Sequence, residues 1–345
     1  MCAMTLRLDP RRPIVWRTPH SLQIGVDPVL AQLDDVSDGH VRLIDALSVG
    51  VTRSGLAMLA EQAGVPAPHV DELLAGLDAA LLSPVTADVR APSALTSKSV
   101  LPTKPEKSMA ARPAPRATIA VVGSGIGATR VAAVLSEAGL AATLVRPGLT
   151  ESTALVRGRR ATAAVLVSAH VIDPREHCRW LRSDVPHVPV VFGEAAVTVG
   201  PLVEVGTTAC LACVEQRRTR DDPARPAIAS QLWGTAAAAE SAGLATEAAV
   251  EALRMLRARI LTSRNNADGD ADADAIARAA VSVRLDAATG DRVEREWWPN
   301  EQCGCGGLSP LSEPALRRES DWGPALLALW SPVATRSARA PFVPA

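Results

Sequence analysis

The chain has 345 residues, 48% of them hydrophobic, and a formal net charge of −1. This length allows two domains with a sizeable core, and the near-neutral charge gives no bulk attraction to nucleic acid or to an anionic membrane. No run of about 18 apolar residues is free of charges or turn formers, and the first residues lack a signal-peptide core. We therefore expect a cytoplasmic protein without a membrane span or a nucleic-acid partner.

Residues 1–87 predict a small module with three short strands followed by three helices. The strands are expected over 12–17, 21–26 and 29–33. The helices are expected to begin near Ser37, Thr52 and Pro66, and the third carries apolar residues at helical spacing up to Leu82. Three strands and three helices in this order predict a winged-helix-like α+β module.

Two segments have compositions that differ from the rest. Residues 88–117 are rich in proline, serine and alanine and hold all three lysines, so they predict a flexible linker. Residues 309–345 predict a short helix and a loose C-terminal tail. Between them, 118–308 alternate strand and helix patterns, including a long alanine-rich helical region over about 231–260.

A glycine-rich loop opens this α/β region. Gly123, Gly125 and Gly127 lie between a predicted strand and a predicted helix, where glycines let a backbone approach phosphates. A tight packing turn explains the same glycines equally well. The second strand ends in Leu144-Val145-Arg146, without the acid that usually binds the ribose. ATP binding is therefore expected to be weak or absent, and Arg146 leaves an NADP phosphate site as an alternative.

Four cysteines form two short pairs about ninety residues apart. They are Cys210, Cys213, Cys303 and Cys305. Two cysteine pairs are typical of a closed tetrahedral zinc site, so we predict structural zinc rather than catalytic zinc. Disulfides and unlinked buried thiols are the alternatives, and a reducing cytosol disfavours the former.

These features together resemble the ubiquitin-activating-enzyme-like superfamily that includes ThiF. The match covers about residues 118–307. It is carried by Val199-Gly200-Pro201-Leu202-Val203, both cysteine pairs, Asp221-Asp222-Pro223, Gln231-Leu232 and Trp298-Pro299. Within the superfamily the chain is similar to actinobacterial ThiF-like proteins that assist azole formation on ribosomal peptides. The resemblance implies a Rossmann-like domain with a mixed sheet.

The resemblance also implies a function. The N-terminal module would bind the leader of a precursor peptide, and a YcaO-like cyclodehydratase would use ATP to form the azoles or azolines. We expect the peptide to add as a strand to an exposed sheet edge. The candidate edge is Val29, Leu30, Ala31, Gln32 and Leu33. Whether the chain forms a homodimer stays open.

Three other functions compete with leader binding. An active ThiF-type adenylyltransferase would use the glycine loop for ATP. A winged-helix DNA reader is disfavoured because the third helix carries Asp71, Glu72 and Asp78 without a basic residue. An NADP reductase lacks a convincing proton donor. A non-catalytic cyclodehydratase subunit is therefore the preferred hypothesis.

Overall fold

The computed structural model describes residues 5–82, 117–148, 155–156, 158–265 and 280–307. The predicted linker lies outside these residues apart from Ala117, and the predicted C-terminal tail lies outside them entirely. The chain divides into two compact units, one formed by 1–12 with 36–116 and the other by 13–35 with 117–345. No helix among the described residues combines the length and the hydrophobicity needed to cross a membrane.

The first unit is mainly helical. Its elements are β1 (Thr5–Leu6), α1 (Asp38–Val49), β5 (Val51–Thr52), α2 (Arg53–Gln62) and α3 (Ala67–Leu77), followed by a short 3-10 turn, η1 (Asp78–Ala80). Ser37 and Thr52 cap α1 and α2 through their hydroxyl oxygens. Leucines at helical spacing, including Leu43, Leu47 and Leu56, are fully buried. This agrees with the apolar periodicity of the sequence.

The second unit begins with a small antiparallel sheet in the order β2-β3-β4. Its strands are β2 (Ile14–Thr18), β3 (Ser21–Ile24) and β4 (Ala31–Leu33). The three predicted strands therefore exist, but they group with the C-terminal unit, whereas the sequence places them with the three helices. The winged-helix arrangement stays a prediction.

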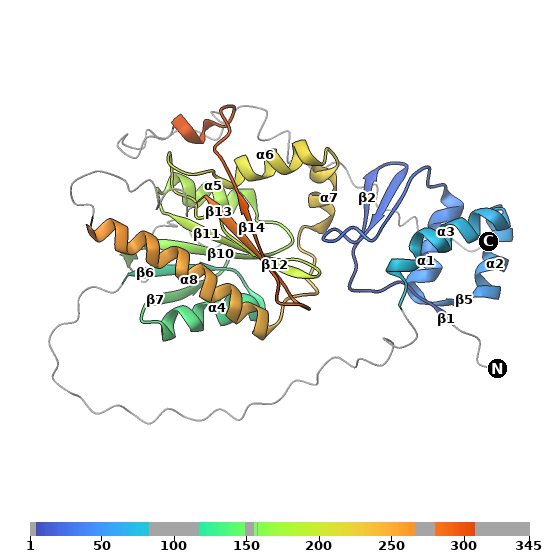
Figure 1. Cartoon of the computed structure of the whole chain (residues 1–345), viewed down its shortest axis with the longest axis horizontal. Helices are drawn as coiled ribbons and strands as arrows, with labels where there is room; N and C mark the ends of the chain where they lie inside the picture. The colour runs from blue at the N-terminus through green and yellow to red at the C-terminus, as the bar shows by residue number, and fades with distance from the viewer. Residues whose placement is uncertain (1–4, 83–116, 149–154, 157, 266–279, 308–345) are drawn as a thin grey trace, which may run out of the picture. The chain divides into compact units, whose positions relative to one another are not determined.

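A seven-stranded mixed sheet is the centre of the second unit, and it confirms the α/β fold class (Figure 1). Its order is β14-β13-β12-β11-β10-β6-β7. The strands are β6 (Thr118–Val122), β7 (Ala141–Val145), β10 (Ala163–Ala169), β11 (His187–Phe192), β12 (Ala196–Val199), β13 (Val281–Asp286) and β14 (Arg292–Glu296). Neighbours from β7 to β11 run parallel, and those from β11 to β14 run antiparallel.

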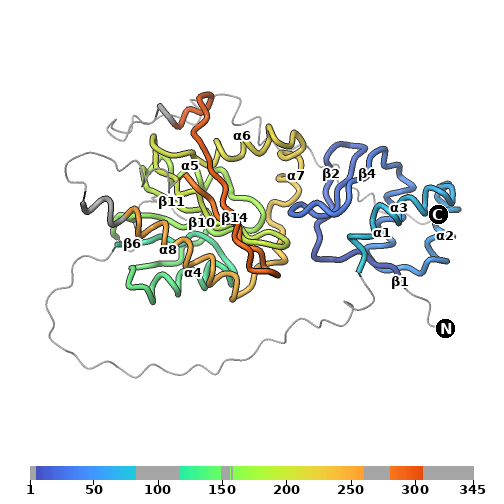
Figure 2. The backbone as a smooth tube through the Cα atoms, viewed as in Figure 1, coloured from blue at the N-terminus to red at the C-terminus, as the bar shows by residue number. Residues whose placement is uncertain are grey.

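Helices cover both faces of this sheet. They are α4 (Gly125–Glu137), α5 (Pro174–Arg182), α6 (Leu211–Asp221) and α8 (Ala242–Asn265), whereas α7 (Arg225–Leu232) packs against β2 of the small sheet. Alternate residues of a strand face opposite sides, so Ile119 packs in the core formed with α4 and α8, whereas Ala120 packs in the core formed with α5 and the cysteines. Figure 2 shows α4 and α8 side by side.

Three smaller elements complete the fold: β8 (Leu155–Val156) with β9 (Arg159–Arg160), and the 3-10 turn η3 (Gly304–Gly307). The predicted helical region over about 231–260 is interrupted in the structure. Helix α7 ends at Leu232, Gly234 has φ +76°, and α8 begins at Ala242. A positive φ ends a right-handed helix, and the surrounding alanines give no periodic signal of this break.

Candidate functional site

The four predicted cysteines come together in one buried cluster. Their sulfur atoms all lie within 4.8 Å of one another. Sγ of Cys210 lies 3.7 Å from Sγ of both Cys213 and Cys303, and Sγ of Cys213 lies 3.5 Å from Sγ of Cys305. These separations exclude disulfides, whose sulfur atoms lie about 2.05 Å apart.

The geometry of the cluster fits a tetrahedral metal. Four sulfurs at the ~2.3 Å zinc–sulfur distance lie ~3.8 Å from each other, close to the 3.5–3.7 Å of the three pairs named above and within the 4.8 Å that bounds all pairs. Four thiolates fill a tetrahedral shell and leave no position for substrate. The residues therefore fit zinc in a structural role.

Local structure explains how the cysteines meet. Cys210 is the N-cap of α6 and Cys213 lies in its first turn, while Cys303 and Cys305 lie at the turn that follows β14. The backbone N–H of Asn300 donates to Sγ of Cys213 at 3.3 Å. Hydrogen bonding with Cys210 lowers the pKa of Cys213 and brings that of Cys303 to about 7. Hydrogen bonding with Cys213 raises the pKa of Cys210, and the pKa of Cys305 is raised as well, so without metal the thiolate that binds zinc is favoured at Cys213 and Cys303 only.

The predicted glycine loop is present, but a side chain of the protein occupies it. Oε1 of Glu240 accepts a hydrogen bond from the backbone N–H of Gly127 at 2.8 Å. The same oxygen lies 2.9 Å from the position that a Cβ would take at Gly125 or at Gly127. Gly125 has φ +83°, so glycine is needed there for backbone conformation as well.

Glu240 therefore stands where a bound phosphate would receive the amides of a helix N-terminus. A carboxylate at that position satisfies an amide that α4 leaves without an intrahelical partner. It also repels a second anion. Arg146, at the end of β7, is exposed, and the nearby carboxylate of Glu176 accepts the backbone N–H of Gly148 and a hydrogen bond from Arg179.

The predicted peptide-binding residues lie at the free edge of the small sheet. Ala31, Gln32 and Leu33 form β4, which pairs with β3 on one side only among the described strands. Val29 and Leu30 precede the strand, and Val29 is 52% exposed. The backbone N–H of Leu30 donates to the carbonyl oxygen of Ile24 at 2.9 Å, which extends the pairing by one residue.

The opposite edge of this sheet is already covered. The backbone N–H of Trp16 in β2 donates to Oε1 of Gln231 at 2.8 Å. In return, Nε2 of Gln231 donates to the backbone carbonyl oxygen of Trp16 at 2.7 Å. The Gln231 amide thus takes the place of a neighbouring strand. Val15 packs beside it against Ile228 and Leu232 of α7.

Charged contacts hold the small sheet to the larger domain. Arg17 binds Asp222 through two hydrogen bonds of 2.5 and 3.0 Å. The carboxylate of Glu194 accepts the backbone N–H groups of Val26 and Asp27, both at 2.8 Å. These contacts position β4 on the second unit.

Sequence reasoning missed Glu240, Gln231 as an edge cover, and Glu194. Each acts on a residue more than 100 positions away, and no local pattern reports such a contact. Gln231 and Asp222 had a partial signal, because both belong to the segments that carry the family resemblance.

Neither a family model nor a curated protein sequence matches the chain. Among solved structures, it is similar to a heterocyclase in complex with substrate and cofactor, with 14% identity, a TM-score of 0.41, and coverage of 90% of this chain and 41% of that one. The heterocyclase TruD gives 17% identity, a TM-score of 0.39, and coverage of 88% and 43%. The chain spans about two fifths of the length of both heterocyclases.

A third similar structure is the E. coli microcin synthetase McbBCD complex. It shares 11% identity with this chain at a TM-score of 0.41, and the match covers 88% of this chain and all of that one. At such identities the likeness is one of fold alone.

Proposed function

We propose that this chain is a non-catalytic subunit that binds the leader of a ribosomal precursor peptide and delivers the peptide to a YcaO-type cyclodehydratase. The cyclodehydratase partner follows from the family resemblance of the sequence. The observation that carries the binding step is the asymmetry of the small sheet. Gln231 binds the backbone of Trp16 at its β2 edge, and among the described strands β4 pairs with β3 alone.

An extended peptide completes an open strand edge through main-chain hydrogen bonds. Along β4 the side chains alternate, with Ala31 buried, Gln32 exposed and Leu33 half-buried. Because the pairing uses backbone atoms, it depends little on the Gln32 side chain or on salt.

The active adenylyltransferase is the weaker alternative. Adenylation needs phosphates at the glycine loop, and Glu240 already accepts the Gly127 amide there. Releasing this carboxylate costs a charge-assisted hydrogen bond. This supports leaving the ATP step to the partner enzyme, with structural zinc as the cofactor of this chain.

Proline variants of the full-length protein test the proposal. Proline removes a backbone donor, and of Ala31→Pro and Gln32→Pro, the one whose N–H points away from β3 should weaken leader binding by at least about tenfold. Precursor peptides encoded beside the gene serve as probes in fluorescence anisotropy, with folding checked by circular dichroism.

Gln32→Ala is the matched control, because it alters the side chain and keeps the backbone N–H. It should bind as the unaltered protein does. Equal affinity in the control and in both well-folded proline variants would reject strand addition at β4.

A further inference from the structure

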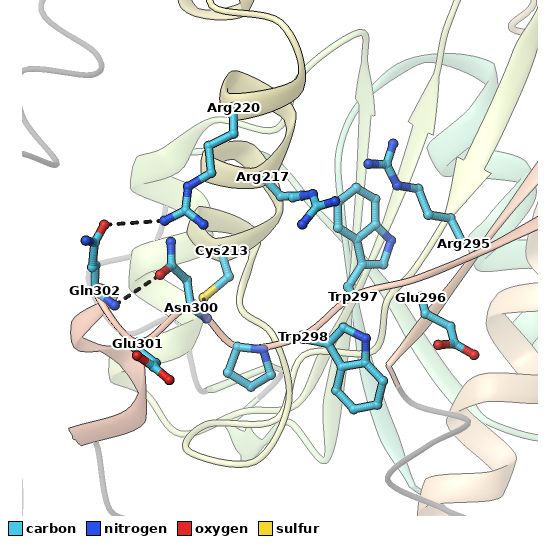
Figure 3. Close-up of a pocket in the computed structure, with 11 residues that line it drawn as sticks. Cys213, Arg217, Arg220, Arg295, Glu296, Trp297, Trp298, Asn300, Glu301 and Gln302 are labelled. Carbon is cyan, nitrogen blue, oxygen red and sulfur yellow. Dashed lines mark hydrogen bonds between the residues drawn. The ribbon is translucent and has the colours of Figure 1, made fainter.

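A cavity next to the cysteine cluster, lined in part by Cys213, has no role in the function proposed above. Its volume is about 490 Å³, and α6 forms one wall (Figure 3). Cys213, Arg217 and Arg220 follow each other at four and three positions along α6. Residues at this spacing share one helical face. The buried zinc ligand and two arginine side chains therefore line the same wall.

The chain between β14 and Cys303 forms the other wall. Trp297 is buried, and its indole N–H donates to Oγ of Ser282 at 2.7 Å. The next residue, Trp298, is 69% exposed. Asn300 hydrogen bonds to Gln216 of α6 and, through its backbone N–H, to Sγ of Cys213. The anchored wall thus presents one large aromatic ring to solvent.

The guanidinium groups of the cavity differ in their partners. Arg295 lies over the Trp297 ring at 4.4 Å and pairs with Asp221 at 2.6 Å. Arg217 pairs with the same aspartate at 3.4 Å. Arg220 donates only to the neutral amide of Gln302, at 3.3 Å, and no carboxylate of the described residues lies within ion-pair distance of it.

Two of these cations are available to a ligand. The Arg217 pair is an exposed surface ion pair, with both side chains at least 45% exposed, and such pairs contribute little. Figure 3 shows the Arg217 and Arg220 side chains directed into the space between the walls, while the carboxylates of Glu296 and Glu301 point away from it. The interior of the cavity therefore favours a carboxylate.

We propose that this cavity is a second binding site, for an acidic peptide segment, independent of the β4 edge. Arg220 and Arg217 would bind a carboxylate of the segment, and Trp298 would cover an adjacent apolar side chain. Arginine pairs with carboxylates through two parallel hydrogen bonds, and an exposed tryptophan beside arginine is typical of a binding surface. The peptide would thus bind against the wall of the cavity that the cysteine cluster holds in place.

A peptide fits this site better than a nucleic acid does. Glu296 and Glu301 lie at the margins of the cavity, where a continuous phosphate backbone would pass them and be repelled. A short acidic segment needs to place only one or two carboxylates within the cavity.

The test uses the full-length protein and a fluorescein-labelled peptide of alternating glutamate and leucine. We expect binding that weakens with salt, and Arg220→Gln should lower the affinity roughly tenfold. Trp298→Ala should weaken it as well. Arg42→Gln is the matched control, since this exposed arginine of α1 undergoes the same change of charge.

Zinc content and the thermal transition verify that each variant is folded. Equal affinity of Arg220→Gln and Arg42→Gln would overturn the proposal. So would equal binding of a peptide with glutamine in place of glutamate, or tighter binding of a single-stranded oligonucleotide that displaces the acidic peptide.

Discussion

At the residue scale, the glycine loop illustrates how much a motif can tell. The sequence places Gly123, Gly125 and Gly127 between a strand and a helix, and in the structure Gly123 lies there while Gly125 and Gly127 already belong to the first turn of α4. It does not reveal that Glu240, 113 positions after Gly127, takes up an amide of that loop. The motif alone therefore cannot distinguish a phosphate site from one occupied by the protein itself.

Removing this carboxylate should create anion affinity. We expect the unaltered protein to bind magnesium–ATP no more tightly than millimolar, about −4 kcal/mol. Glu240→Ala should bind ATP roughly tenfold more tightly, because the Gly127 amide becomes available and a like charge is lost. Calorimetric titration measures both.

Glu247→Ala, at an exposed position of α8, is the control and should behave as the unaltered protein. Micromolar ATP binding by the unaltered protein would instead support the hypothesis that the chain is an active adenylyltransferase.

A buried histidine pair makes stability depend on pH. Nδ1 of His177 lies 3.0 Å from Nε2 of His187, and Nδ1 of His187 lies 2.9 Å from the carbonyl oxygen of Val185. Since a carbonyl only accepts, His187 donates through Nδ1 and accepts from His177. Burial lowers the pKa of His187 to about 4, and burial with the neighbouring His187 lowers that of His177 well below its usual value.

The direction of the pH dependence of stability follows from these lowered pKa values. The folded state binds fewer protons than the unfolded chain, so stability is complete above about pH 6.5 and falls as the pH drops toward 4. At pH 5, His187 alone should cost about 2 kcal/mol. Urea unfolding at pH 7 and at pH 5 measures this difference in the free energy of unfolding.

The His187→Leu variant should be less stable but should lose less between pH 7 and pH 5. The exposed His69→Asn should keep the full loss. An unchanged pH dependence in His187→Leu would contradict this role of the pair.

At the element scale, the spacing of the cysteines predicts their clustering better than the pattern of apolar residues predicts where helices begin and end. The two cysteine pairs lie on α6 and on the turn after β14, about ninety residues apart, and still converge. Fixed spacing within each pair restricts where the sulfurs can point. The break between α7 and α8 had no comparable signal among alanines.

Zinc should join these two elements. We expect about one zinc per chain, and Cys213→Ser or Cys305→Ser should lose it. Because structural zinc supplies ~10–16 kcal/mol of apparent binding energy, either variant should be strongly destabilised. Elemental analysis with thermal unfolding measures both effects.

Cys178→Ser is the matched control, since Cys178 is half-buried and is not part of the cluster. It should retain the metal. Full zinc content in Cys213→Ser and in Cys305→Ser would refute the assignment.

At the scale of the whole molecule, long-range contacts determine which unit a segment belongs to, and the order of elements along the sequence does not reveal this. The three N-terminal strands precede three helices, and the sequence groups them together. The structure groups them with the C-terminal unit, because Gln231, Asp222 and Glu194 bind their backbone and side chains. Gln231 covers the β2 edge of the small sheet at Trp16, and in the part of the chain that the structure describes β4 pairs with β3 alone.

The central claim is that β4 receives an extended peptide. Hydrogen exchange of the full-length protein, with and without a precursor peptide encoded beside the gene, tests it most directly. Added strand pairing protects the amides of the receiving edge. We predict slower exchange across residues 29–33, and unchanged exchange at Trp16, whose N–H Gln231 already accepts. Protection at the glycine loop without any change at 29–33 would contradict the account.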